Sequence, residues 1–241
     1  MQVIHDSIKE HQAQMPTLTL LETLRLAGPS TALLGANALF RAHHDRLVPL
    51  RPLLRKAHNL AMAVYSLWVF VHVSRVLASP MQHGWRTLVC DSVSQPAIPG
   101  WELSKYVELL DVALVYAAGR RPSNLLLYHH ATAGLAVVVN TVGRPTPTPL
   151  YWIGSWMNAG VHAVMYLYYL WPRQLRVFKI WITLSQIAQH FAMVGLLITT
   201  PVMEDCDDVP HGQYAASLVL YASYLYLFVD FFTTTYKPKR A

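Results

Sequence analysis

Two adjacent histidines, His129 and His130, lie near the start of an apolar stretch, 124–142, that is long enough to cross a lipid bilayer. An arginine pair, Arg120 and Arg121, directly precedes this stretch. A neutral imidazole can transfer a proton or attack an acyl group as a nucleophile. Because ionisable side chains are costly inside a membrane, histidines at this depth indicate a functional site.

A second polar group lies in the apolar stretch 150–171. Its members are Asn158, His162, Tyr166 and Tyr169. Positions i, i+4, i+8 and i+11 fall on one face of an α-helix, so these side chains line a single face. One isolated His or Tyr is typical of a satisfied core position, whereas a stripe of polar side chains in a membrane span favours a binding or catalytic site.

Two further apolar stretches, 101–118 and 177–200, also carry polar side chains. The first stretch holds Lys105, Glu108 and Asp111, at three-residue steps. On a helix these charges lie near one another and can neutralise each other, so a structural ion network that braces the helices is an alternative to a site. The second stretch holds Gln186, Gln189 and His190. Glutamines can also join helices by hydrogen bonds, which makes this group weaker evidence.

Composition indicates which elements position these side chains. The chain has 241 residues, of which 54% are hydrophobic and 13% charged, about half the charged share of a soluble domain. We expect membrane spans at 17–40, 58–79, 101–118, 124–142, 150–171, 177–200 and 212–234. The first is the weakest because Glu22 and Arg25 lie inside it, so six spans are possible. The expected fold class is all-α, a polytopic membrane bundle of seven helices, forming one domain over residues 1–241.

Loop charge predicts the orientation of this bundle. With seven spans, the loops on one side carry basic residues: Arg41, Arg46, Arg51, Arg55, Lys56, Arg120, Arg121, Arg173, Arg176, Lys179, Lys237, Lys239 and Arg240. The loop 201–211, on the other side, is acidic. The positive-inside rule places the basic side and the C-terminus in the cytoplasm. The net charge of +6 is thus a topological signal and implies no nucleic-acid partner.

Both cysteines of the chain fall on the predicted lumenal side. Cys90 follows the second span and Cys206 lies in the acidic loop. A disulfide can persist in that compartment, so a bridge between them is plausible. Two unpaired thiols remain the alternative, because sequence does not show whether the two loops come within bonding distance.

The polar groups of four spans lie at similar depths. Counting about 1.5 Å per residue, they come about 8 to 14 Å from the basic end, which predicts one pocket opening toward that side. Membrane di-iron oxidases use H-x-x-H-H boxes and need many histidines, whereas here the position three before His129 is Leu126 and few histidines lie within spans. We therefore expect no metal and favour acyl transfer.

From about residue 48 to the C-terminus, the chain resembles the ELO family of very-long-chain fatty acid elongases. The segments that carry the resemblance, in the family's order, are RPLLRKAHNLAMAVYS, SKYVELLD, LYHH, NAGVHAVMYLYY, ITLSQIAQHF and LYLFVDFFTTTY. Each is weak alone, but their common order is specific.

The resemblance implies a seven-helix protein of the endoplasmic reticulum that condenses acyl-CoA with malonyl-CoA to give 3-ketoacyl-CoA, CO2 and CoA. It implies an acyl-chain tunnel in the bundle, an acyl-histidine intermediate on His129, and His162 and His130 as its catalytic partners. The implied substrate-binding residues are Lys105, Glu108, Asp111, Asn158, Tyr166, Tyr169, Gln186, Gln189 and His190. No cofactor is implied beyond the two CoA substrates. The implied partners are membrane lipids, other elongation enzymes and a second copy of the chain.

Two residues depart from the family pattern. Leu126 stands where the family's box has its first histidine, and His190 stands where the family usually has phenylalanine. The alternative is therefore a divergent, weakly active or inactive relative that binds acyl-CoA or another lipid. A receptor or transporter would leave the histidines without a role. The lysines Lys237 and Lys239 resemble a K-x-K-x-x retrieval signal of the endoplasmic reticulum, and a merely basic membrane flank is the alternative.

Overall fold

The computed structural model describes residues 51–236 without 92, 143, 145, 204, 205, 207 and 208, together with Gly28, Gly35, Ala38, Leu39 and Ala42. The predicted first span, the acidic side chains of the loop 201–211 and the tail 237–241 thus lie largely or wholly outside the described residues. Within the described residues the structure is helical and contains no strand. The all-α prediction is confirmed.

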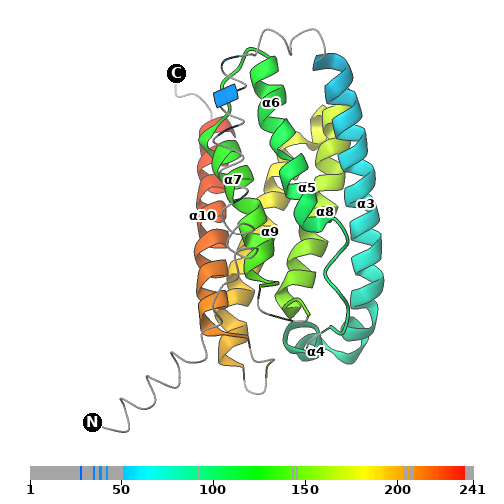
Figure 1. Cartoon of the computed structure of the whole chain (residues 1–241), viewed down its shortest axis with the longest axis vertical. Helices are drawn as coiled ribbons and strands as arrows, with labels where there is room; N and C mark the ends of the chain where they lie inside the picture. The colour runs from blue at the N-terminus through cyan, green and yellow to red at the C-terminus, as the bar shows by residue number, and fades with distance from the viewer. Residues whose placement is uncertain are drawn as a thin grey trace, which may run out of the picture.

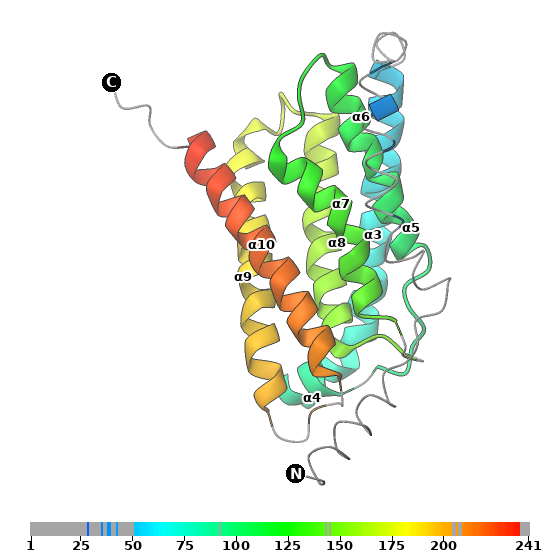
Figure 2. The ribbon, with the colours of Figure 1, turned by 60° about the vertical axis from the view of Figure 1, so that its left-hand side comes forward.

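Among the described residues, the long helices lie side by side and run alternately up and down (Figures 1 and 2). The α-helices are α3 (Arg51–His83), α4 (Trp85–Cys90), α5 (Trp101–Val107), α6 (Leu109–Ala117), α7 (Asn124–Val139), α8 (Pro149–Leu170), α9 (Lys179–Thr199) and α10 (His211–Tyr236). Two short 3-10 helices, η1 (Arg176–Phe178) and η2 (Thr200–Val202), flank α9. Helix α3 packs on α8, α8 and α10 pack on α9, and α7 packs on α10.

The described part of the chain contains three helices that could cross a membrane by length and composition. They are Pro52–His83, Arg176–Val202 and His211–Tyr236, and α7 is a shorter apolar helix. These properties fit a membrane bundle. The number of seven spans remains a prediction. The loops after α6 and after α8 lie at the same end as the start of α3 and the end of α10 (Figure 1), as the alternating spans predicted.

Local sequence signals set the starts of the helices that carry the polar groups. Ser123 caps α7, because its Oγ accepts a hydrogen bond from the Leu126 amide at 3.2 Å. Thr148 caps α8 in the same way through the Tyr151 amide at 3.2 Å, and Pro149 follows at the first helical position. These caps fix where His129 and Asn158 lie along their helices.

The predicted span 101–118 is interrupted in the structure. Helix α5 ends at Val107 and α6 begins at Leu109, because the Asp111 amide bonds to the Glu108 carbonyl three residues back, at 3.0 Å. A turn of this tighter kind brings side chains at i and i+3 close together. Here these positions are Glu108 and Asp111, and the prediction of one continuous helix is wrong at Glu108. Lys105 lies before this turn and forms an ion pair with Glu108, three residues on.

Helices α3 and α8 approach closely at Gly160. The buried residues Val69, Val73 and Leu77 of α3 pack against Trp152 of α8. A Cβ atom at Gly160 would lie 3.0 Å from the Phe70 ring, which is tighter than ordinary van der Waals contact. This glycine therefore permits the close approach of the two helices.

A disulfide joins Cys90, at the end of α4, to Cys206, in the segment before α10. Their Cα atoms are 4.4 Å apart and 116 residues separate them in sequence. Cys90 also packs in a buried cluster with Leu150 and Met193. The bridge therefore ties the end of α4 to the segment before α10, at the end of the bundle opposite the α6–α7 loop.

We expect Gly160→Ala to lower the free energy of unfolding by about 1–3 kcal/mol, because the added methyl overpacks the α3–α8 contact. The matched control is Gly195→Ala in α9, where nothing lies within 4 Å of a Cβ atom. The control should be neutral or slightly stabilising, since alanine favours a helix. Thermal unfolding in detergent measures both. Equal effects of the two variants would contradict the close approach.

Replacing Cys90 and Cys206 together by serine should cost about 2–5 kcal/mol of stability, as is typical for loss of a native disulfide. Intact-mass measurement after alkylation reports the bridge directly. The unreduced native protein should take up no alkylating groups and the reduced protein two. Alkylation of both thiols without reductant would show that the bridge does not form.

Candidate functional site

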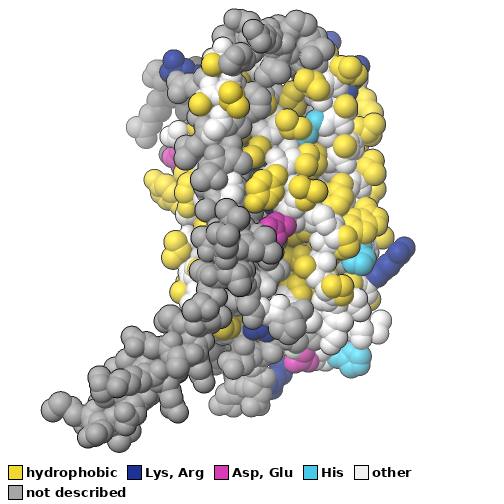
Figure 3. All heavy atoms as spheres, viewed as in Figure 1, with side chains coloured by type: hydrophobic (Ala, Val, Ile, Leu, Met, Phe, Trp, Pro, Cys, Tyr) yellow, Lys and Arg dark blue, Asp and Glu magenta, His cyan; other side chains and the backbone are white. Residues whose placement is uncertain are grey.

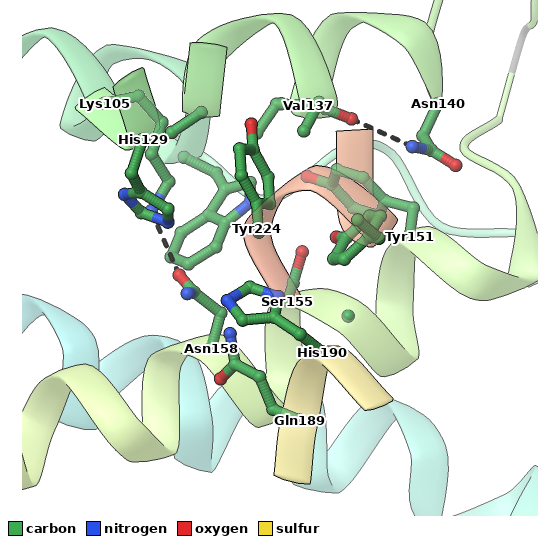
Figure 4. A pocket seen from close by; sticks show the side chains of 15 residues that line it. Lys105, His129, Val137, Asn140, Tyr151, Ser155, Asn158, Gln189, His190 and Tyr224 are labelled. Atoms are coloured by element: carbon green, nitrogen blue, oxygen red, sulfur yellow. Dashed lines mark hydrogen bonds between the residues drawn. The ribbon is translucent and has the colours of Figure 1, made fainter. Parts of the chain in front are cut away.

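A narrow cavity of about 50 Å³ lies between α5, α7, α8, α9 and α10. Each of these five helices contributes polar side chains to the lining, as Figure 4 shows: Lys105, His129, Asn158, Gln189, His190 and Tyr224. From His129 the lining runs along one face of α7 to Asn140, passing Ala133 and Ala136. The cavity therefore has polar side chains around His129 and small side chains, Ala133 and Ala136, along α7.

His129 stands among aromatic rings. Its ring centroid is 5.0 Å from that of Tyr224, 6.0 Å from Phe228 and 6.3 Å from His190. The Tyr224 hydroxyl donates to Thr132 at 2.8 Å, which holds this tyrosine beside α7. No described residue forms a hydrogen bond with the His129 ring nitrogens. The imidazole is therefore held by ring packing, with its nitrogens available to a substrate.

His190 and Gln189 present two buried polar atoms across the cavity from His129 (Figure 4). His190 is 2% exposed and stacks on Phe228 at 5.1 Å, while its Nδ1 has no hydrogen-bond partner among the described residues. Gln189 is 7% exposed, and its Oε1 also lacks a described partner. Buried polar atoms without partners are costly and mark places where a ligand or water can bind.

Polar side chains of α8 face the charged side chains of α5 and α6, and three pairs form along the helices. Lys105 Nζ donates to Asn158 Oδ1 at 3.1 Å. Glu108 Oε1 lies 3.6 Å from His162 Nδ1. The Tyr166 hydroxyl donates to Asp111 Oδ2 at 2.8 Å. The three pairs hold α8 in register with α5 and α6.

Lys105 also serves as the partner of Glu108. Its ammonium donates to Glu108 Oε1 at 2.8 Å and lies 3.9 Å from the centre of the Trp101 ring. Lys105 is 4% exposed and Glu108 only 1%, so both charges are buried. The second carboxylate oxygen of Glu108 has no described partner. The pair is thus both a structural brace and a source of charge beside the cavity.

Asp111 of α6 contacts residues from three other helices, α3, α7 and α8. His58 of α3 donates to Asp111 Oδ1 from Nε2 at 3.0 Å, and His130 Nε2 lies 4.0 Å from Oδ2. His58 is 7% exposed and was not among the predicted site residues. The sequence feature that could have indicated it is its place as an ionisable residue at the first position of the predicted span 58–79. The aromatic residues of α10 beside His129 were missed as well, because aromatic residues in a span are usually core.

The predicted site residues therefore fall into three places. The cavity holds Lys105, His129, Asn158, Gln189 and His190. The adjoining buried network holds Glu108, Asp111, His130, His162 and Tyr166. Outside both lie Gln186, whose amide contacts Met165 Sδ at 3.5 Å, and Tyr169, which is 41% exposed. Within the described residues, no group of three or more His, Cys, Asp or Glu side chains is arranged to hold a metal ion.

Comparison with known proteins gives a family match over residues 32–241, to the model described as ELO: GNS1/SUR4 family. The chain is similar to very long chain fatty acid elongase 6 of Mus musculus, at 32% identity over 203 residues, covering 76% of this chain and 74% of that protein. It is also similar to very long chain fatty acid elongase 3 of Homo sapiens, at 28% identity over 199 residues, covering 75% and 71%. Two relatives from Schizosaccharomyces pombe are longer, and the match covers 54% and 61% of their lengths.

We expect Lys105→Met to lower stability by about 3–5 kcal/mol, because it leaves the Glu108 charge buried without its partner. Combining it with Glu108→Gln removes that charge and should recover a large part of the loss. Thermal unfolding of the two single variants and the double variant measures the coupling between the residues. If the loss of stability in the double variant equals the sum of the two single losses, Lys105 and Glu108 do not stabilise each other, and the ion pair does not account for their burial.

Proposed function

The chain belongs to the ELO (GNS1/SUR4) family, and from this premise we propose that it condenses a long-chain acyl-CoA with malonyl-CoA. The products are a 3-ketoacyl-CoA, CO2 and CoA. Relatives named as fatty acid elongases support a role in fatty acid elongation. The observation that carries the specific reaction is the cavity that brings His129 together with Lys105, Asn158 and His190.

In the first half-reaction, an imidazole nitrogen of His129 attacks the thioester carbonyl carbon of the acyl-CoA. A C–N bond forms, the C–S bond breaks, and CoA leaves as a thiolate that takes up a proton. In the second half-reaction, malonyl-CoA loses CO2, and its enolate carbon attacks the acyl-imidazole. A C–C bond then forms and the C–N bond breaks. The departing ring nitrogen takes up one proton from solvent, which replaces the proton that the ring gave to the CoA thiolate and returns His129 to its starting state.

Asn158 is the residue best placed to stabilise the oxyanion of both steps. Its Oδ1 accepts a hydrogen bond from Lys105, so its amide NH2 group is the end left to donate to a substrate oxygen. The Lys105 ammonium adds positive charge on the same side of the cavity. His190 Nδ1 and Gln189 Oε1 supply one further contact each, which a bound substrate would satisfy.

The residues of the buried network do not line the cavity and act on it through the residues that do. His162 lies beside Glu108 and can hold or move the proton that leaves with CoA. His130, whose ring centroid is 5.5 Å from that of His129, packs against the nucleophile and also approaches Asp111. We assign Tyr166 and Asp111 to positioning of this network, and Gln186 and Tyr169 to contacts with substrate parts beyond the cavity.

Charge and apolar lining support the binding of both parts of an acyl-CoA. The connections after α6 and after α8 lie at the end of the bundle where α7 begins, five residues before His129 (Figure 1). These connections carry Arg120, Arg121, Arg173 and Arg176, which can bind the CoA phosphates. The acyl chain would follow the lining of α7 past Ala133 and Ala136 toward Asn140. At about 50 Å³ the cavity must widen to admit it.

We also propose the endoplasmic reticulum membrane as the location, a cytoplasmic C-terminus, no cofactor beyond the substrates, and association with other elongation enzymes or a second copy.

The narrowness of the cavity favours one second candidate, a divergent ELO protein that binds acyl-CoA or another lipid with little or no turnover. Leu126, at the position of the family's first box histidine, packs in an apolar cluster with Leu109 and Val112. No polar side chain therefore takes over that position. Production of 3-ketoacyl-CoA from acyl-CoA and malonyl-CoA by purified protein separates the two candidates.

The acyl-histidine route has a direct test with acyl-CoA alone. Native protein should release CoA and gain one acyl mass on the peptide that contains His129, before any malonyl-CoA is present. His129→Ala should abolish both events, and His162→Ala should slow them. The control is His83→Ala, at the far end of α3, where the exposed imidazole bonds to the Ser79 carbonyl of its own helix at 2.8 Å.

Near-normal condensation by His129→Ala would refute the covalent route. So would acyl transfer that requires malonyl-CoA to be bound first. Direct attack of the enolate on a bound thioester, with the histidines as acid and base, would then replace it.

A further inference from the structure

A second cavity, of about 590 Å³, opens on the flank of α3 toward its C-terminal end. It lies between the second half of α3, the short helix α4 and the loop after α4. Its polar lining residues are His72, Arg75, Thr87, Asp91, Ser94 and Gln95. None of its lining residues belongs to the cavity that holds His129, so it is a separate site.

Arg75 is the unusual member of this lining. It is exposed, although it lies on Pro52–His83, one of the helices long and apolar enough to cross a membrane. Neither Arg75 nor Asp91 has a side-chain hydrogen bond or ion pair within the described ranges. Lipid tails cannot satisfy a guanidinium, so an arginine here requires a polar partner from the membrane interface.

The depth of Arg75 matches that interface. It stands four residues before the end of the predicted span 58–79, which is about 6 Å. Trp85 of α4, just beyond, is 60% exposed. Exposed tryptophan is typical of the headgroup level of a bilayer. The cavity therefore opens where lipid phosphates lie.

An apolar stripe on α3 leads to Arg75 from the other end of the helix. Leu60, Val64, Leu67 and Val71 are 54%, 61%, 54% and 40% exposed. Their spacing places them on the same helical face as Arg75. The stripe from Leu60 to Arg75 is about 22 Å long, which exceeds one leaflet of the hydrocarbon core. A lipid with its phosphate at Arg75 could lay an acyl chain along this face.

We propose that this cavity binds the headgroup of a zwitterionic glycerophospholipid of the phosphatidylethanolamine type. The Arg75 guanidinium binds the phosphate, for which its planar geometry is suited. The Asp91 carboxylate, at the C-terminal end of α4, binds the ammonium group, and Thr87, Ser94 and Gln95 offer oxygen acceptors to its remaining N–H bonds. His72 stacks on Trp68, with ring centroids 5.3 Å apart, and forms an aromatic wall.

The pairing of charges selects this class of lipid. One exposed cation and one exposed carboxylate share the cavity without contacting each other, which matches a ligand that carries both signs. An anionic headgroup would use Arg75 and be repelled by Asp91. Figure 3 shows basic and histidine side chains beside apolar ones on the flank formed by α3. This inference does not depend on the proposed condensation reaction.

Native mass spectrometry of delipidated full-length protein tests the site, with phosphatidylethanolamine or phosphatidylglycerol added in turn. Arg75→Gln should reduce the phosphatidylethanolamine adduct by about tenfold, the loss expected for a charge-assisted contact. Asp91→Asn should reduce that adduct while sparing phosphatidylglycerol, so the preference between the two lipids falls. Arg55→Gln, which removes the same charge from an exposed position at the other end of α3, should change neither adduct.

Unchanged adducts in Arg75→Gln, or an equal loss in Arg55→Gln, would overturn the site. An unchanged lipid preference in Asp91→Asn would overturn the assignment of the ammonium. Displacement of the lipid by inorganic phosphate at equal concentration would show a phosphate site instead. If Arg75→Gln fails to fold, Arg75→Lys keeps the charge without the planar fork and should still weaken the phosphatidylethanolamine adduct; full retention by this variant would refute the bidentate contact.

Discussion

Burial of the Lys105–Glu108 ion pair is the constraint on which the rest of the bundle depends. Both side chains are almost fully enclosed, and a buried charge without a partner would cost several kcal/mol. Asn158 and His162 complete the pair from α8, at 3.1 Å and 3.6 Å. Helix α8 can therefore neither slide nor rotate against α5 without separating these groups.

The same constraint prepares the proposed chemistry. Because Lys105 holds the oxygen of the Asn158 amide, the nitrogen of that amide is the end presented to a ligand. His129 comes from a different helix, whose start is fixed by the Ser123 cap, and Tyr224 of α10 packs on its ring. A brace, a cap and an aromatic contact thus bring together groups that are far apart in the sequence.

The two ends of the bundle differ in what they can bind. The end with the arginine-bearing loops lies nearer the histidines and suits an anionic substrate. The opposite end carries the Cys90–Cys206 bridge and the α3 flank cavity, which both Arg75 and Asp91 line. The bridge restrains α4, and α4 forms one wall of that flank cavity. The stabilising disulfide and the proposed lipid site therefore lie at one end of the bundle, and the proposed catalytic site lies toward the other.

Sequence alone determined the helical class, the stripe of α8 and the common side of the two cysteines. These features follow from local periodicity and from the alternation of spans, which need no knowledge of packing. Only the tertiary structure decided which polar residues meet. It brought in His58, interrupted the span at Glu108, and left Gln186 and Tyr169 outside the cavity. The physical reason is that the rotation of each helix about its axis is set by contacts with its neighbours, and residue spacing within one helix does not specify it.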